Sequence, residues 1–258
     1  MYINNLNPVL LNLGPLEIRW YGIVYVLGFF MSLWWMLYLQ KKGKPDIHKE
    51  QIWDFVFYCM VGVLVGARVF MIFWQPEMYL LKPWNLLKIW EGGMSFHGGF
   101  VGIVVAGWWY CKKNKLNFWT MADILSVPAI FVLALGRIAN FVNGELIGRV
   151  WPGKWCVVFP QYDSLCRHPS TLYAAAKRFV VFGWLVLLTF RQEFKPGFIF
   201  WNFVFFEGLG RFIVDFYRED ILYVGLSLGQ WFSAIMIIVS LVIFMKYYRN
   251  EWRKIQKT

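Results

Sequence analysis

Seven long apolar runs, separated by short polar segments, constrain this chain more than any other feature of its sequence. A helix needs roughly 20 residues to cross a hydrocarbon core of about 30 Å. The pattern therefore predicts an all-α polytopic membrane protein, with a single transmembrane domain over residues 1–258 and about seven spans. The runs cover residues 20–39, 52–74, 96–111, 118–141, 174–190, 197–216 and 226–247. The third is the shortest, and Gly98 and Gly99 near its start suggest an irregular entry into the bilayer.

Composition supports a membrane protein and excludes an ordinary soluble domain. Apolar residues make up 59% of the chain and charged residues only 16%, whereas a soluble domain carries about a quarter charged residues. The net charge is +11, but the basic residues are dispersed rather than gathered into the patch that binds nucleic acid. We therefore expect no nucleic-acid partner. Residues 1–15 hold no charge and lack the features of a cleavable signal peptide, which predicts a short arm on the membrane surface.

The distribution of lysine and arginine predicts the orientation of the spans. Fourteen basic residues fall on the side that contains 41–49, 112–115 and the C-terminus, against nine on the opposite side. Because dense basic clusters mark the cytoplasmic side, the N-terminus is expected outside and the C-terminus inside. The longest loop, about 142–173, is then an extracytoplasmic cap. Its Cys156 and Cys166 would form a disulfide if that loop faces an oxidising compartment. The four cysteines lack the spacing of a metal site, so we expect no metal.

The most polar stretch follows the fourth apolar run, at residues 136–149. Arg137 and Asn140 are three residues apart and Gly144 is seven from Arg137, so a continuing helix would place them on one face. Snorkelling of Arg137 to the membrane surface, with the Asn-Gly pair as a simple turn, is the competing interpretation. Ionisable residues at membrane depth are nevertheless candidates for function.

Other polar groups near the apolar runs are candidates as well. His97 lies between two glycine pairs and suits proton transfer near neutral pH, although a lone histidine is often structural. In the sixth run, acidic and basic residues alternate along one helix face, either as a self-neutralising ladder or as a phosphate-binding wall. These four residues are Glu207, Arg211, Asp215 and Arg218. Single polar residues elsewhere are Tyr21, Arg68 and Asp123, the last of which we expect to pair with an arginine.

With these residues in view, the sequence resembles the bacterial prolipoprotein diacylglyceryl transferases. The family's signature matches Gly136-Arg137 and the polar positions that follow up to Arg149, and glycines flank His97 as in the family. The other matching segments are Trp20-Tyr21-Gly22, residues 92–99, residues 167–173, Arg211-Phe212, Phe216-x-Arg218 and Gly229-Gln230-Trp231. They follow the family's order across nearly the whole chain.

The resemblance implies an enzyme of the bacterial cytoplasmic (inner) membrane that crosses it several times. It would move the diacylglyceryl group of phosphatidylglycerol to the lipobox cysteine of a prolipoprotein and release glycerol 1-phosphate. No cofactor is implied. We hypothesise His97 as the base, or as the group that orders it, and Arg137 and Arg211 as phosphate-binding catalytic residues. The expected substrate-binding residues are Tyr21, Asn140, Asn143, Gly144, Glu145, Gly148 and Arg218.

The chain departs from the family pattern at three places. Glu207 stands where a tyrosine is usual, Ala174 where an acid usually follows Leu-Tyr, and residues 218–220 lack the usual proline. Glu207 would either neutralise Arg211 and weaken its phosphate contact or be neutral itself, and the sequence leaves both alternatives open. Together, these changes suggest a divergent member of the family. The alternatives are a transporter or flippase for an anionic solute or lipid, and a lapsed lipid-binding homologue. Against a transporter, the sequence has no inverted repeat.

Overall fold

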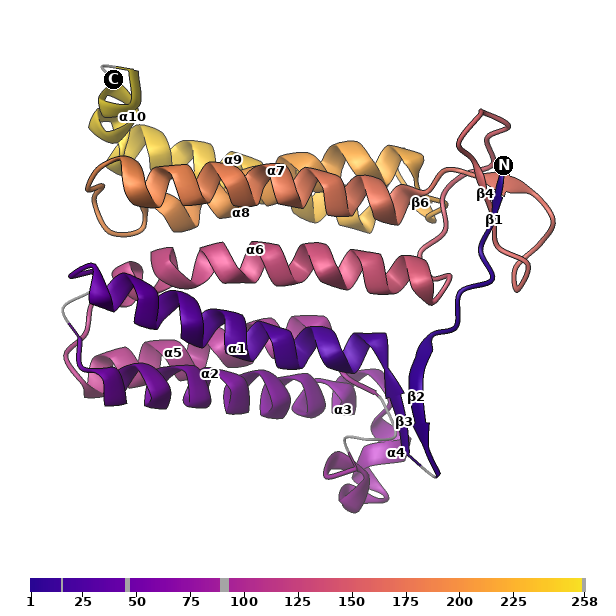
Figure 1. Ribbon diagram of the computed structural model, residues 1–258, viewed down its shortest axis with the longest axis horizontal. Coiled ribbons are helices and arrows are strands. Elements are labelled where there is room, and N and C mark those ends of the chain that lie inside the picture. The colour runs from indigo at the N-terminus through magenta and orange to yellow at the C-terminus, as the bar shows by residue number, and fades with distance from the viewer. Residues whose placement is uncertain (15, 45–46, 89–92, 257–258) are drawn as a thin grey trace. The chain divides into compact units, whose positions relative to one another are not determined.

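The computed structural model describes residues 1–14, 16–44, 47–88 and 93–256, and helices dominate these ranges (Figure 1). Each apolar run of the sequence corresponds to a helix over most of its length. The long helices are α1 (Trp20–Lys41), α2 (Lys49–Val69), α5 (Phe96–Lys113), α6 (Phe118–Val142), α7 (Ser170–Arg191), α8 (Phe198–Val214) and α9 (Leu228–Tyr247). The short ones are α3 (Met71–Trp74), α4 (Pro76–Leu80), η1 (Pro83–Leu86), η3 (Asp215–Tyr217) and α10 (Arg249–Gln256).

In the described part of the chain, five helical segments are long and apolar enough to cross a membrane. They are α1, the continuous segment of α2 and α3, α6, α7 and α9. The other two expected spans are α5, with 18 residues, and α8, with 17, which also carries Glu207 and Arg211. A multi-pass membrane protein is thus supported, while the count of seven spans and their orientation stay predictions.

The helices fall into two compact units. One combines residues 1–31 with 122–258, and the other holds residues 32–121. In the first unit, α8 packs against both α7 and α9 (Figure 1). Gly208 of α8 permits the approach of α9, because an added Cβ would lie 3.1 Å from the Ser233 carbonyl oxygen. Close approach at small residues is the usual basis of helix packing in membranes.

Glycines also hold the second unit together, where α2 packs against α5. Gly62 and Gly66 on α2 face Gly98 and Gly102 on α5, and a Cβ at any of them would overlap the backbone of the other helix. Two Gly-x-x-x-Gly pairs therefore meet, an arrangement that brings helix backbones together. Ser95 caps α5 by accepting the Gly98 N–H at 3.3 Å. The predicted irregular entry at Gly98 and Gly99 is therefore wrong, because regular helix begins at Phe96.

The loop between α6 and α7 forms a small sheet with the N-terminal arm. Strand β1 (Tyr2–Ile3) pairs in parallel with β4 (Val157–Val158), which pairs antiparallel with β5 (Cys166–Arg167). The disulfide between Cys156 and Cys166 is formed and links the residue before β4 to the first residue of β5. Phe141 of α6 and three loop residues, Ile147, Val157 and Phe159, form a small apolar core that packs against Leu172 of α7. Burial of one such side chain stabilises a fold by roughly 1.5–3 kcal/mol.

The rest of the predicted N-terminal arm is mostly extended. Strand β2 (Val9–Leu13) pairs antiparallel with β3 (Leu16–Arg19), and the chain then enters α1. Asn4 anchors the arm by donating to the Phe141 carbonyl at 2.6 Å. The arm therefore belongs to the fold of the first unit, and its position at a membrane surface stays a prediction. A second hairpin pairs β6 (Leu222–Tyr223) with β7 (Leu226–Ser227) before α9.

Candidate functional site

The polar end of α6 is organised by Asn140, a buried side chain that bonds three others. Its Oδ1 accepts a hydrogen bond from Arg137 Nη1 at 3.2 Å. Its Nδ2 donates to the Tyr21 hydroxyl at 2.9 Å and to Glu145 Oε2 at 2.7 Å. The prediction that Arg137 and Asn140 share a helix face is confirmed, and two further candidates from the sequence join them.

The chain turns sharply after α6. Gly144 has a φ of +65° and Leu146 a φ of +55°, and a non-glycine residue in this region is strained. Because α6 ends before Gly144, the expectation that Gly144 extends the helix face of Arg137 is wrong. Asn143 Nδ2 donates to Glu145 Oε1 at 3.0 Å. Glu145 thus accepts hydrogen bonds from two amide groups, one at each of its carboxyl oxygens.

Gly148 brings the end of this stretch against the segment that follows α8. It forms an antiparallel bridge with Arg218, and a Cβ at this position would overlap the carbonyl oxygen of His168. Arg149 donates its backbone N–H to the Tyr217 carbonyl at 2.9 Å and its Nε to the Arg218 carbonyl at 3.0 Å. The expected substrate-binding residues Gly148 and Arg218 are therefore direct neighbours.

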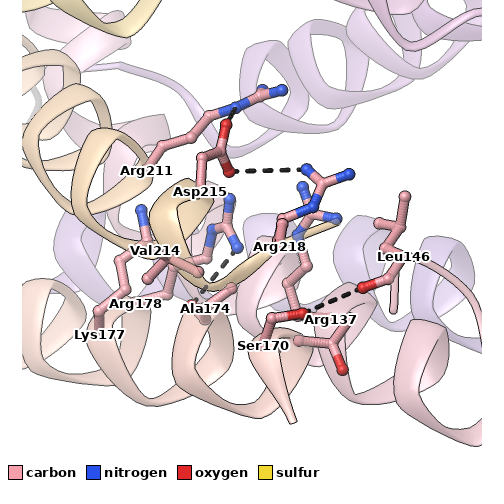
Figure 2. Close-up of a pocket in the computed structure, with 11 residues that line it drawn as sticks. Arg137, Leu146, Ser170, Ala174, Lys177, Arg178, Arg211, Val214, Asp215 and Arg218 are labelled. Carbon is pink, nitrogen blue, oxygen red and sulfur yellow. Dashed lines mark hydrogen bonds and ion pairs between the residues drawn. The ribbon is translucent and has the colours of Figure 1, made fainter. Parts of the chain in front are cut away.

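Asp215 lies between two of the predicted cationic residues, as Figure 2 shows. Its carboxylate is 3.6 Å from Arg211 Nε and 3.6 Å from Arg218 Nη1. Arg218 also pairs with Asp220 at 2.9 Å. Three of the four alternating charges, Arg211, Asp215 and Arg218, therefore meet around the Asp215 carboxylate. These ion pairs are compatible with both interpretations, and phosphate binding by this face stays a prediction.

Glu207 takes no part in that ladder. Its carboxylate pairs with Lys177 and Arg178, which both project from α7. The possibility that Glu207 neutralises Arg211 is therefore wrong. Lys177 and Arg178 of the neighbouring helix α7 provide the positive charge that pairs with the Glu207 carboxylate instead. Arg178 also donates to the carbonyl of Ala174 at 3.4 Å, so the departures from the family pattern at 174 and 207 both contact Arg178.

These residues enclose a small cavity (Figure 2). Its described lining consists of Arg137, Leu146, Ser170, Thr171, Ala174, Lys177, Arg178, Arg211, Val214, Asp215 and Arg218. The volume is about 10 Å³, roughly the room that one water molecule needs. A phosphate group would therefore have to spread the side chains apart.

The described cavity wall has an excess of positive charge. Five basic side chains line it, whereas three carboxylates contact them: Asp215, Glu207 and Asp220. Arg137 forms no ion pair within the described residues, since its one side-chain partner there is the neutral Asn140. Arginine stays charged when it loses water and binds phosphate with two parallel hydrogen bonds. The arrangement is suited to an anionic group such as a phosphate.

The adjoining loop is fixed by Arg167, whose side chain is 6% exposed. It pairs with Asp163 and Glu219 and donates to the Gly148 carbonyl at 3.0 Å. The hydrogen bond from Arg167 holds the pKa of Asp163 below its usual value. His168 stacks on Trp151 with ring centroids 4.4 Å apart. These contacts hold Gly148, and with it the wall of the cavity, in place.

Two polar residues of uncertain role in the sequence have structural partners. Asp123 accepts the backbone N–H groups of Gly197 and Phe200, each at 2.7 Å, at the start of α8. The expected pairing of Asp123 with an arginine is wrong, because the free N–H groups of a helix start bind a carboxylate well. Arg68 is 5% exposed and bonds Tyr79 at 3.1 Å and the Gly93 carbonyl at 3.0 Å.

His97, the expected base, is the second residue of α5 and is exposed. It belongs to the unit of residues 32–121, whereas the cavity belongs to the other unit. Its partnership with Arg137 therefore stays a prediction.

Sequence reasoning missed Lys177 and Arg178 as site residues, since both are simply two of the nine basic residues on the expected outer side. They lie inside α7, about two turns from its start. Two adjacent cations at that depth are costly in a membrane, and this cost was the signal that could have identified them. Ala174, Lys177 and Arg178 have the spacing of one helix face, which is the face that lines the cavity.

Comparison with known proteins gives one consistent result. The profile of the family described as "Prolipoprotein diacylglyceryl transferase" matches residues 8–246. Three relatives carry the name phosphatidylglycerol–prolipoprotein diacylglyceryl transferase. The one from Rickettsia akari is 38% identical over 93% of this chain and 96% of its own length. The one from Geobacter sulfurreducens is 37% identical over 97% and 99%, and the one from Aeromonas hydrophila 39% over 96% and 93%.

Proposed function

Because this chain belongs to the prolipoprotein diacylglyceryl transferase family, we propose that it transfers a diacylglyceryl group from phosphatidylglycerol to a prolipoprotein. The acceptor is the lipobox cysteine thiol, and the second product is glycerol 1-phosphate. The enzyme acts in the bacterial cytoplasmic membrane, with seven spans, the N-terminus outside and the C-terminus inside. The transporter interpretation gains no support from the names of the relatives.

The observation that carries the proposal is the cation-lined cavity built from the family's signature residues. Arg137 comes from the end of α6, and Arg211 and Arg218 come from α8 and the segment after it. Phosphatidylglycerol presents a phosphodiester with a single negative charge at the membrane surface. The excess of positive charge in the cavity supports the binding of that phosphate by Arg137 and Arg211.

The reaction is a displacement at carbon. The thiolate sulfur attacks the glyceryl carbon that carries the phosphate, so an S–C bond forms while the C–O bond to phosphate breaks. The electron pair of that bond stays on the phosphate oxygen, and the thiol proton goes to a base. Because the thiolate is the reactive form of cysteine, the site needs a proton acceptor near neutral pH, and His97 is our candidate.

Uncharged and acidic groups next to Arg137 suit the glycerol part of the headgroup. Asn140, Asn143 and Glu145 form a continuous hydrogen-bonded set that reaches Tyr21. In our proposal, its amides and carboxylate bind glycerol hydroxyls, or orient Arg137 through Asn140. Gly144 and Gly148 shape the backbone around this set. Arg218, tied to Asp215 and Asp220, closes the other side of the cavity.

One assay tests the proposal. The purified protein is mixed with phosphatidylglycerol and a lipobox peptide, and the peptide mass is measured. We expect a thioether-linked diacylglyceryl peptide, with none formed from the same peptide carrying serine in place of cysteine. Absence of the product with a folded enzyme would refute the transfer. Movement of a solute or lipid across vesicles without that product would instead favour a transporter.

A further inference from the structure

Two basic side chains of α7 enlarge the cationic wall of the cavity, and neither belongs to the signature residues considered above. Lys177 and Arg178 both line the cavity and both pair with Glu207 of α8. The side chains of all three are largely buried, with exposures of 16%, 4% and 11% respectively. A single carboxylate thus holds two cations at one wall and neutralises one of the two charges.

Arg178 has unused hydrogen-bonding capacity at this wall. Its Nη2 donates to Glu207 and its Nη1 to the Ala174 carbonyl at 3.4 Å. Its Nε is buried and has no hydrogen-bond acceptor within the described residues. A buried donor of a charged group is costly to leave without an acceptor. A ligand oxygen in the cavity would remove part of that cost.

Contacts with α8 fix the position of the Lys177 side chain, which projects from α7. Its Nζ donates to the Glu207 carbonyl oxygen at 3.2 Å and to the Glu207 carboxylate. Two acceptors leave one of the three ammonium N–H groups for another partner. The absence of a side chain at Gly210 makes room for Lys177, since an added Cβ would lie 2.6 Å from its Cδ.

The charge of the substrate changes during the proposed reaction. When the C–O bond breaks, the phosphodiester, with a single negative charge, becomes a phosphate monoester with a charge of about −1.5 to −2 near pH 7. The five basic side chains of the wall exceed the three carboxylates on them by two. The described site therefore matches the charge of the departing group better than that of the bound lipid.

We propose that Lys177 and Arg178 are two further catalytic residues, which stabilise the additional negative charge on the departing phosphate, and that Glu207 is the positioning residue that holds them. The inference rests on the proposed function. Groups aimed at charge that develops in the transition state raise kcat more than they improve substrate binding. The thiolate attack and the C–O cleavage are unchanged, and neither cation takes part in the proton transfer.

The test is a kinetic comparison of Arg178→Gln with the parent, using phosphatidylglycerol and a lipobox peptide. Loss of one such donor lowers kcat by about 100-fold. We expect the KM for phosphatidylglycerol to stay within roughly threefold, because an interaction made only in the transition state affects kcat and kcat/KM alike. Inhibition by added glycerol 1-phosphate should weaken at least about tenfold, which is the change for a loss of about 1.4 kcal/mol of product binding. Lys154→Gln removes a cation from an exposed loop position and should match the parent.

A second variant keeps the test decisive if Arg178→Gln alone does not fold. Arg178→Gln combined with Glu207→Gln removes one positive and one negative charge together, and kcat should still fall. If the parent forms the thioether product and a folded variant lacking Arg178 has the parent's kcat and product inhibition, this inference is wrong. If the parent forms no product at all, the proposed function itself fails.

Discussion

Replacement of Glu207 by glutamine should destabilise the protein strongly. The substitution keeps the shape of the side chain but removes the carboxylate that pairs with Lys177 and Arg178. Both cations would then lie in a largely buried site without a counter-charge, and the new amide would point donors towards them. Loss of one partner from a buried ion pair costs about 3–5 kcal/mol. For a chain of this size, that cost corresponds to a fall of roughly 6–20 °C in the unfolding temperature.

Thermal unfolding in one detergent, at one scan rate, measures this effect, because unfolding of such proteins is commonly irreversible. The matched control replaces Lys177, Arg178 and Glu207 together by leucine or methionine. Replacement of a whole buried ion cluster by apolar residues is often neutral or stabilising, so the triple variant should unfold close to the parent temperature while losing activity. An unfolding temperature of Glu207→Gln within about 2 °C of the parent, well under the shift for 3 kcal/mol, would refute the role of Glu207 as counter-charge.

Three further predictions concern other parts of the same unit. Asp123→Asn leaves one of the two backbone N–H groups at the start of α8 without an acceptor and the other with a neutral one, so it should lower the free energy of unfolding by about 1–3 kcal/mol; an unchanged thermal unfolding midpoint would contradict the cap. Arg167 lowers the pKa of Asp163, so that carboxylate stabilises the fold above its unfolded pKa of about 3.9. That stabilisation is lost as the pH falls through the lower folded pKa, so the melting temperature of Asp163→Asn should fall less steeply with acid than the parent's; parallel curves would contradict this. Gly148→Ala should reduce the transfer rate at least about tenfold, because its Cβ overlaps a backbone carbonyl and displacement of the backbone at a site costs more than about 1.4 kcal/mol of the activation free energy. Gly183→Ala, with open space around the added Cβ, should leave the transfer rate unchanged.

The sequence predicts the helices well and their ends less well. Long apolar runs define helices because a chain in lipid satisfies its backbone polar groups within the helix. The Arg137–Asn140 contact was also predictable, because a spacing of three residues on a helix places two side chains together whatever surrounds them. Gly144 was misplaced because α6 ends at Val142, and the chain enters a left-handed turn at Gly144 and Leu146 that the helical spacing does not predict.

Partners that come from other helices were not predictable in the same way. Along α8, Arg211 is the natural partner of Glu207 at a spacing of four, yet Glu207 pairs with Lys177 and Arg178 of α7. A single sequence does not show which helices are in contact. The spacing within α8 therefore suggested a partner for Glu207 that is not the one it has in the fold. Asp123 was misassigned for the same reason, since the donors to its carboxylate are backbone N–H groups at the start of α8, which the sequence pattern does not reveal.

The central claim is that the cation-lined cavity around Arg137 takes up the phosphate that leaves when the thioether forms. The most direct measurement supplies phosphatidylglycerol labelled in its terminal glycerol and quantifies both the thioether and the labelled glycerol phosphate. It compares the parent with Arg137→Gln, provided that the variant unfolds at the same temperature as the parent. The account predicts one labelled glycerol phosphate for each thioether formed by the parent, and neither product from Arg137→Gln. Thioether formed without labelled glycerol phosphate, or formed at the parent rate by a folded Arg137→Gln, would contradict it.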